Sequence, residues 1–220
     1  MKINKNILIH IIGIGGIGMS GIAEILSDMR YHVQGSDINI NSNILRLNKK
    51  NIKTFKGHKQ ENLKNVNLIV YSTAVKKSNV ELTFAKKNKI PSITRAEILS
   101  QIVKLKNSIA ISGSHGKTTT TSLISSILNA AKMNPTVING GIINQFGTNT
   151  RLGSGKWMVV EADESDGTFV KLPSTIAVVT NIDKEHLDFY KNYNNLLIQF
   201  KKFITQVPFY GFAIVCIDDL

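Results

Sequence analysis

Short apolar runs alternate with amphipathic segments along the first half of the chain. Ile7–Ile12 and Leu68–Tyr71 have the length and continuity of buried parallel strands. After the first of these strands, a helical spacing places four apolar residues on one face: Ile17, Ile22, Ile25 and Leu26. The segments "YHVQGSD" and "IPSITR" predict further strands, whereas "NSNILRLNKKN", "SNVELTFAKKN" and "RAEILSQIVKLK" predict helices. This alternation predicts a parallel sheet with right-handed crossovers.

The same pattern begins again near Asn107. "SIAISG" predicts a strand, and "KTTTTSLISSILNAAK" predicts a helix with an apolar stripe of Leu123, Ile124, Ile127 and Leu128. Further strands are expected in "PTVING", "KWMVVEAD", "TIAVVTN" and the terminal "GFAIVCIDD", with a helix in "YNNLLIQFKKFITQV". We therefore predict an α/β chain of two successive parallel-sheet domains, residues 1–106 and 107–220. The last strand stands at the very end, so the second domain is expected to be partial.

A glycine loop joins the first predicted strand to the first helix. Gly13, Gly15 and Gly18 satisfy the pattern G-x-G-x-x-G, in which a tight turn lets a diphosphate approach the backbone at a helix N-terminus. Asp37 ends the next strand, where a carboxylate can accept a hydrogen bond from a ribose hydroxyl. This pattern predicts a Rossmann-like domain that binds a diphosphate nucleotide, and by itself it is also typical of NAD-binding proteins.

A second glycine loop, "GSHGKTTTT", opens the helix of the second domain. Its Gly116-Lys117-Thr118 matches the end of a common P-loop, but Ile111 stands where that motif has its first glycine. We expect the shorter loop from Gly113 to cradle phosphates, with Lys117 meeting the β- and γ-phosphates and Thr118 binding Mg²⁺. The predicted ATP-binding residues are Gly113, Ser114, His115, Gly116, Lys117, Thr118 and Thr119.

Acidic residues and a histidine follow two later strands of the second domain. Glu161 directly follows an apolar strand, so its carboxylate is expected at the ligand-binding edge of the sheet, as a partner of Thr118 on Mg²⁺. His186 is expected to be a second metal ligand or a phosphate contact. Three further acids either point to the same edge or form a solvated loop: Asp163, Glu164 and Asp166.

Composition narrows the class of protein. The chain has 220 residues, of which 42% are hydrophobic and 19% charged, as in a soluble globular protein. Its net charge of +12 comes from scattered lysines without an arginine-rich run, which favours a generally basic surface over nucleic-acid binding and also suits an anionic small substrate.

Neither a targeting segment nor a membrane span is expected. Glycines interrupt the N-terminal apolar run, no signal cleavage site follows it, and no apolar stretch is long enough to span a bilayer. The single cysteine, Cys216, excludes an internal disulfide, and we expect it to be a buried, inert thiol in the last strand. We expect a cytoplasmic protein.

Two separate nucleotide sites argue against a simple dehydrogenase, which would leave the second loop unexplained. They indicate a reaction in which ATP activates a group on a second, nucleotide-linked substrate. Several segments together resemble the Mur ligase family: "GSHGKTTTTSLI", "VINGG", "EADESDGTF", "VTNIDKEHLDFY", "VPFYGFAIVCIDD" and the N-terminal "HIIGIGGIGMSGIAEIL" with "VQGSD" and "STAV". The resemblance extends from about Ile7 to the last residue.

The resemblance implies a ligase of cell-wall peptidoglycan synthesis that uses ATP and Mg²⁺ as cofactors. ATP would phosphorylate the carboxylate of UDP-N-acetylmuramate, and the amine of L-alanine would attack the acyl phosphate to form an amide. Lys117, Glu161 and His186 would be the catalytic residues, with Thr118, Glu161 and His186 as metal ligands. UDP-N-acetylmuramate, in place of NAD, would be bound by Gly13, Gly15, Gly16, Gly18, Ser36, Asp37, Ser72 and Thr73.

Two departures from the family pattern matter. The family's third, C-terminal domain is not recognised in these residues, so we expect the chain to bind UDP-N-acetylmuramate, and ATP weakly, but to ligate nothing alone. No carbamylated lysine is assigned, because neither Lys201 nor Lys202 gives a clear match.

Three competing functions stay open at the level of sequence. The nearest is a ligase that adds a preformed murein peptide to the same UDP-sugar, although Ser165 of "EADESD" favours L-alanine. A non-catalytic UDP-sugar-binding or regulatory fragment is compatible with the lack of a recognised third domain. An NAD-dependent dehydrogenase is more distant, because it explains only the first glycine loop.

Overall fold

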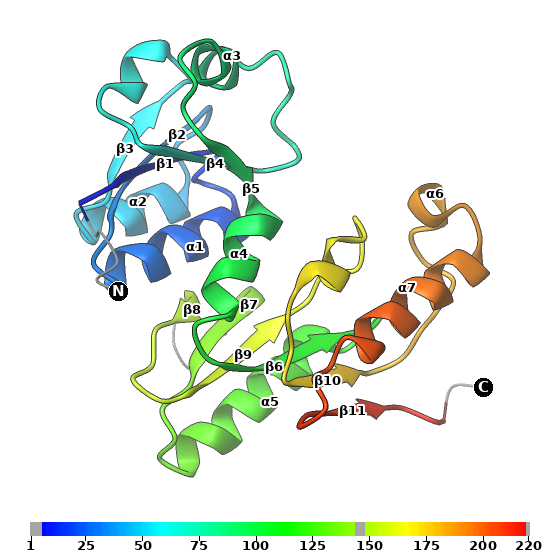
Figure 1. Ribbon diagram of the computed structural model, residues 1–220. Helices are drawn as coiled ribbons and strands as arrows, with labels where there is room; N and C mark the ends of the chain where they lie inside the picture. Colours follow the sequence, from blue (N-terminus) through cyan, green and yellow to red (C-terminus); the bar gives the residue numbers. More distant parts are fainter. Residues whose placement is uncertain (1–5, 144–147, 219–220) are drawn as a thin grey trace. The chain divides into compact units, whose positions relative to one another are not determined.

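The computed structural model describes residues 6–143 and 148–218, and the chain divides into two compact units, Met1–Ile98 and Leu99–Leu220 (Figure 1). The division falls inside the connecting helix α4 (Arg95–Val103), upstream of Lys106. Both units are α/β, each built on its own sheet, which confirms the predicted fold class. Within the described ranges, no helix is long and apolar enough to cross a membrane.

The first unit contains a five-stranded parallel sheet in the order β3-β2-β1-β4-β5. Its elements are β1 (Leu8–Ile12), α1 (Ile17–Asp28), β2 (His32–Asp37), α2 (Ser42–Lys49), β3 (Lys53–Lys56), the short 3-10 helix η1 (Gln60–Leu63), β4 (Leu68–Tyr71), α3 (Val80–Lys87) and β5 (Ser92–Thr94). Helices α1 and α2 lie on one face of this sheet, and α3 lies on the other (Figure 1). Asn41 and Asn79 cap α2 and α3 by accepting hydrogen bonds from backbone amides in the first turn of each helix.

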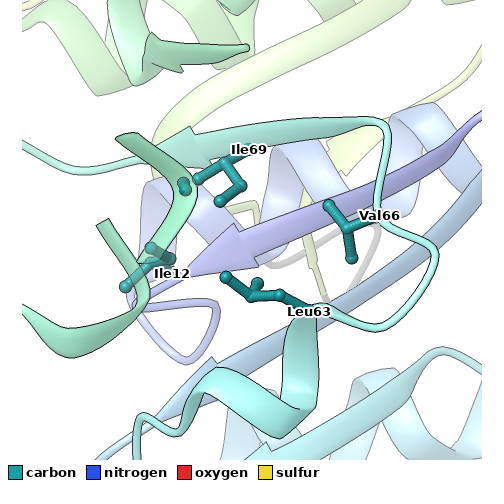
Figure 2. Packing of buried hydrophobic residues seen from close by; sticks show 5 residues of the cluster. Ile12, Leu63, Val66 and Ile69 are labelled. Carbon is teal, nitrogen blue, oxygen red and sulfur yellow. The ribbon is translucent and has the colours of Figure 1, made fainter. Parts of the chain in front are cut away.

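The core beneath α3 is made of small branched and aliphatic side chains. Figure 2 shows Ile12, Leu63, Val66 and Ile69, which pack together from β1, η1, the following loop and β4. Ala85 of α3 completes the cluster. Ile12 is the last residue of β1 and has no exposed surface. The strand is therefore anchored at the point where the first glycine loop begins.

The second unit has a six-stranded sheet in the order β11-β10-β6-β9-β7-β8. Its elements are β6 (Asn107–Ser112), α5 (Lys117–Ala130), β7 (Thr136–Ile143), β8 (Thr148–Arg151), β9 (Trp157–Glu161), the 3-10 helix η2 (Thr168–Lys171), β10 (Ile176–Val179), α6 (Leu187–Tyr190), α7 (Tyr193–Thr205) and β11 (Phe212–Val215). All strand pairs are parallel except β7–β8, so the sheet is mixed at one edge; β8 lacks a counterpart among the predicted strands.

Two details of the predicted core are wrong. On α5, Ile124 and Leu128 pack on the sheet, but Leu123 and Ile127 are 59% and 66% exposed, so the four residues do not form one buried stripe. Ile17 of α1 is likewise half exposed, whereas its three predicted partners on that face are buried.

The last strand is exposed instead of buried. All four residues of β11 are exposed, and the strand lies at the edge of the sheet, where it pairs only with β10 among the described strands. Cys216 follows β11 and is also exposed, which corrects the expectation of a buried thiol.

Candidate functional site

The second glycine loop leaves the carboxyl end of β6 and enters α5 through two glycines with left-handed backbone. Gly113 has φ +136°, and a Cβ atom there would lie 2.1 Å from Thr180 Oγ1 and 2.9 Å from the carbonyl oxygen of Asn181. Gly116 precedes α5 with φ +76°. Only glycine tolerates both the positive φ and the lack of room for a Cβ atom at position 113. The loop therefore lies directly against the residues that follow β10.

Hydrogen bonds join this loop to the residues after β10. The amides of Ser114 and His115 donate to the backbone and side-chain oxygens of Asn181, at 3.0 and 2.7 Å. Thr180 Oγ1 donates to the carbonyl of His115 at 2.6 Å, and Ser114 Oγ accepts from the amide of Asp183 at 2.8 Å. Two loops at neighbouring strand ends are thus held as one rim. Above it, the first turn of α5 presents backbone N–H groups that have no intrahelical acceptor.

Lys117 is held at this rim by three oxygen atoms. Its Nζ donates to the carbonyls of Gly113 and Ser114, at 2.6 and 3.0 Å, and to Glu164 Oε1 at 2.9 Å. Glu164 is 1% exposed, and its other oxygen, Oε2, has no hydrogen-bond partner. Burial raises the pKa of Glu164 above its ordinary value of 4.5, and the bond from Lys117 opposes this shift. Of the three acids left open by the sequence, Glu164 is therefore the one that is buried at the loop.

Thr118 pairs with a different carboxylate. Its Oγ1 donates to Glu161 Oε2 at 2.9 Å, and the same oxygen accepts from the amide of Gly140 at 3.0 Å. A Cβ atom at Gly140 would lie 2.4 Å from Glu161 Oε1, so a glycine is needed for the carboxylate to occupy this position. The expected proximity of Thr118 and Glu161 is confirmed. The contribution of Gly140 was missed, although "VINGG" contains it.

His186 lies next to Glu164. Its Nε2 is 3.6 Å from Glu164 Oε1, and Glu164, Glu185 and His186 each place one ligand atom within 4.8 Å of the others. Tyr190 supports this arrangement, because its hydroxyl donates to the carbonyl of Glu164. Burial, followed by the Glu164 charge, raises the pKa of Tyr190 to about 12. His186 thus belongs to a cluster with Glu164 and Glu185.

The remaining predicted residues of this loop face solvent. His115 and Thr119 are exposed, and His115 Nε2 is 3.0 Å from Asp183 Oδ2 in an exposed ion pair. Asp163 is exposed as well, and Asp166, two residues before the start of η2, accepts hydrogen bonds from the amide and hydroxyl of Thr168. Of the three acids left open by the sequence, Glu164 is thus buried at the loop, whereas Asp163 and Asp166 accept hydrogen bonds within their own turn.

The first glycine loop uses its own amides to hold its shape. Gly13 and Ile14 donate to the carbonyl of Ser36, Gly15 donates to Asp37 Oδ2 at 2.8 Å, and Gly16 donates to Gly13. Asp37, which the sequence placed at a ribose, thus accepts from the loop itself. Gly18 lies in the first turn of α1.

A pocket of about 520 Å³ lies beside this loop. Gly13, Gly16, Asp37 and Ser72 line it, whereas Thr73 does not. Ser36 is fully buried and donates its hydroxyl to Glu81 at 2.6 Å. The volume is in the range that accommodates a nucleotide-sized ligand. His58 also lines the pocket; a lone histidine in "KGHKQ" carries no signal that would have identified it.

Comparison with known families gives one result for each unit. Residues 8–107 match the model described as Mur ligase family, catalytic domain, and residues 111–220 match the Mur ligase middle domain.

Comparison with individual proteins agrees with the family matches. The chain is 56% identical over 219 residues to UDP-N-acetylmuramate–L-alanine ligase of Brucella anthropi, covering 99% of this chain and 47% of that protein. It is 55% identical to the enzyme of the same name from Methylorubrum populi, covering 96% of this chain and 45% of the relative. The chain thus spans about half the length of the curated relatives it matches.

Two solved structures share the fold along nearly the whole chain. The UDP-N-acetylmuramate–alanine ligase of Thermotoga maritima superposes with a TM-score of 0.89 at 29% identity, over 97% of this chain and 50% of that one. The UDP-N-acetylmuramate:L-alanyl-γ-D-glutamyl-meso-diaminopimelate ligase of Neisseria meningitidis gives a TM-score of 0.90 at 26% identity, over 97% of this chain and 72% of that one.

Proposed function

Because this chain belongs to the Mur ligase family, we propose that it supplies the substrate-binding and ATP-binding units of a ligase that joins L-alanine to UDP-N-acetylmuramate. The observation that carries the ATP-dependent part is the pair of neighbouring residues Lys117 and Thr118, each paired with a different carboxylate at one sheet edge. The choice of L-alanine rests on relatives named UDP-N-acetylmuramate–L-alanine ligase, to which the chain is 55–57% identical.

The reaction divides into two group transfers. A carboxylate oxygen of UDP-N-acetylmuramate attacks the γ-phosphorus of ATP, and ADP leaves. The amine nitrogen of L-alanine then attacks the acyl carbon, phosphate leaves, and the nitrogen loses a proton. Lys117 and the first-turn amides of α5 are proposed to hold the phosphates and to neutralise their charge. Lys117 would exchange its contact with Glu164 for one with phosphate.

The residues at this edge fit a bound Mg²⁺. Oxygen donors predominate, as this hard cation prefers, and the buried Glu164 Oε2 has no partner. Thr118 and Glu161 would hold the ion that accompanies ATP, and His186 with Glu164 and Glu185 offers a second group of ligands. When bound, Mg²⁺ would offset the negative charge of the transferred phosphoryl group. Glu161 and His186 are therefore proposed to act as ligands.

We propose that the pocket beside the first glycine loop takes UDP-N-acetylmuramate. Gly13, Gly16, Asp37 and Ser72 line it, and its position at the carboxyl edge of a parallel sheet is where such folds bind nucleotides. We also propose that the division of roles follows the two units, residues 1–106 for the UDP-sugar and 107–220 for ATP. A cytoplasmic location follows as part of the proposal, since the substrates are cytoplasmic nucleotides.

Binding is the step to test on this chain, because it spans about half the length of the curated relatives. Isothermal titration calorimetry should show saturable binding of UDP-N-acetylmuramate and no competition by NAD. The substitution Lys117→Ala should weaken binding of ATP with Mg²⁺ and leave the UDP-sugar unaffected. Absence of UDP-sugar binding, or tight binding of NAD, would refute the proposal.

The amine substrate needs a separate assay. The chain, and the full-length Brucella anthropi relative as positive control, would be mixed with ATP, Mg²⁺, UDP-N-acetylmuramate and either L-alanine or the murein tripeptide. Chromatography of the UDP-linked products identifies the amine that is joined. We expect no product from the chain alone, and preference for the tripeptide by any active preparation of this chain would favour the peptide ligase instead.

A further inference from the structure

A buried carboxylate lies beneath the pocket of the first unit. Glu81 of α3 has no exposed surface, and it accepts hydrogen bonds from Ser36 Oγ at 2.6 Å and Asn62 Nδ2 at 2.7 Å. Burial by itself raises the pKa of Glu81, but hydrogen bonds from His10 and Ser36 lower it below its ordinary value. Glu81 therefore carries a negative charge at neutral pH. A buried charge of this kind needs a positive partner.

Two histidines contact Glu81 Oε2, and the second nitrogen of each ring has different surroundings. His10 Nε2 is 3.4 Å from this oxygen, and its Nδ1 is 3.3 Å from Gln34 Nε2. Gln34 Nε2 also donates to the carbonyl of Asn62, which fixes the orientation of the amide. An amide nitrogen only donates, so His10 Nδ1 accepts a hydrogen bond and the His10 ring is neutral.

His58 is the histidine that can carry the positive charge. Its Nδ1 is 3.2 Å from Glu81 Oε2 and 2.9 Å from Ser36 Oγ, and a carboxylate only accepts, so Nδ1 bears a hydrogen. The side chain is 15% exposed and lines the pocket. The Nδ1 edge of the ring faces the buried carboxylate. The Nε2 edge is therefore the part of the ring that a ligand in the pocket can reach.

The first glycine loop offers few free donors to an anion. The amides of Gly13, Ile14, Gly15 and Gly16 already donate within the chain. A diphosphate in this pocket therefore requires a donor or cation from outside these four amides. We propose that His58 is that group: it binds the diphosphate of the UDP-sugar through Nε2–H as an imidazolium, and Glu81 is its positioning residue.

This inference rests on the proposed function, because the ligand is UDP-N-acetylmuramate. The substitution His58→Gln keeps a polar side chain but removes the charge, and it should weaken binding of the UDP-sugar about 10- to 100-fold, the value of a hydrogen bond to a charged group. Uridine has no diphosphate and cannot make this contact, so its affinity should change less than about twofold in His58→Gln. His32→Gln is the matched control, because His32 is exposed on β2 and does not line the pocket.

The pH profile separates a charged contact from a structural one. An imidazolium binds the diphosphate through its charge, and this contact is lost when the ring loses its proton, so affinity of the parent chain for the UDP-sugar should be lower in mildly alkaline than in mildly acidic buffer. The diphosphate diester of the UDP-sugar keeps its charge in both buffers. His58→Gln should show a flat profile. The charged or titratable groups around the His58 ring are Glu81 and His10 beneath it, Asp37 and Lys76 in the pocket wall, and Lys59 next in the chain.

Nitrogen-15 spectra of the histidine-labelled parent chain provide a measurement without substitution. Addition of UDP-N-acetylmuramate should shift the His58 Nε2 signal, identified by its loss in His58→Gln, because Nε2–H gains the diphosphate as its acceptor. Glu81→Gln should reduce this shift and the affinity together. Parent binding that is unaffected by His58→Gln, or that depends on Lys76→Gln instead, would overturn this inference alone. Failure of the parent chain to bind the UDP-sugar would overturn the proposed function itself.

Discussion

Replacing Gly140 with alanine tests whether a backbone position holds the Glu161 carboxylate. An added Cβ would lie 2.4 Å from Glu161 Oε1 and 2.9 Å from its carboxyl carbon, so the side chain must move. The movement would break the contacts of Oε2 with Thr118 Oγ1 and with the amide of residue 140, at 2.9 and 3.0 Å. Because both are partly exposed, their combined loss should cost about 2 kcal/mol, below the sum for two buried hydrogen bonds to a charge.

A double-mutant cycle isolates this clash. Glu161→Asp shortens the side chain, so Gly140→Ala should cost about 1 kcal/mol less in that background than in the parent chain. Urea unfolding can be followed through the single tryptophan, Trp157, which begins the strand that ends at Glu161. This probe reports on the second unit, which matters because the two units need not unfold together.

The same variants should lose the Mg²⁺ dependence of ATP binding. Gly140→Ala displaces the carboxylate, and Glu161→Gln removes its charge while keeping its shape, so both should reduce the effect of Mg²⁺ on ATP affinity by about tenfold, one charge-assisted contact. Additive stability effects in the cycle, or an unchanged Mg²⁺ effect in Gly140→Ala, would show that Gly140 does not hold Glu161.

Three further predictions concern buried and exposed side chains of the second unit. Burial raises the pKa of Glu164, so protonation of this residue stabilises the folded state near pH 4.5, and this stabilisation is lost as the pH rises through the folded-state pKa. Urea unfolding should therefore show Glu164→Gln to be more stable than the parent chain at about pH 8 but not near pH 4.5. Tyr190→Phe removes the hydroxyl bonded to the Glu164 carbonyl, which still accepts from Gly167, and should cost about 1 kcal/mol; an unchanged unfolding midpoint would contradict this. Native Cys216 should react at once with an aromatic disulfide reagent, whereas a thiol that reacts only in denaturant would contradict its exposure.

The strand ends could be predicted from the sequence because each is a short apolar run followed by a distinctive residue. Thr118 follows the loop after β6 and Glu161 ends β9, and because β6 and β9 are adjacent parallel strands, the proximity of the two residues follows from topology. The helix α5 shows where periodicity was insufficient. Thr121 and Ser125 are buried on the side where Ile124 and Leu128 are partly buried against the sheet, and Ser125 Oγ donates to the carbonyl of Thr121. A small hydroxyl residue such as Ser125, whose side chain bonds within its own helix, can face a sheet, and a count of apolar positions assigns it to the wrong side.

Partners far apart in the chain decide which acid of "EADESD" is buried. Lys117 is 47 residues from Glu164 and Tyr190 is 26 residues away, and both contact it at the sheet edge. The local sequence pattern around Glu164 identifies neither of these distant partners. The same holds for His58, whose partner Glu81 lies on a helix 23 residues further along. Folding places one ring edge of His58 against the buried Glu81 and the residue in the wall of the pocket. Function therefore depends on pairs formed by folding, and these pairs are what the proposed variants separate.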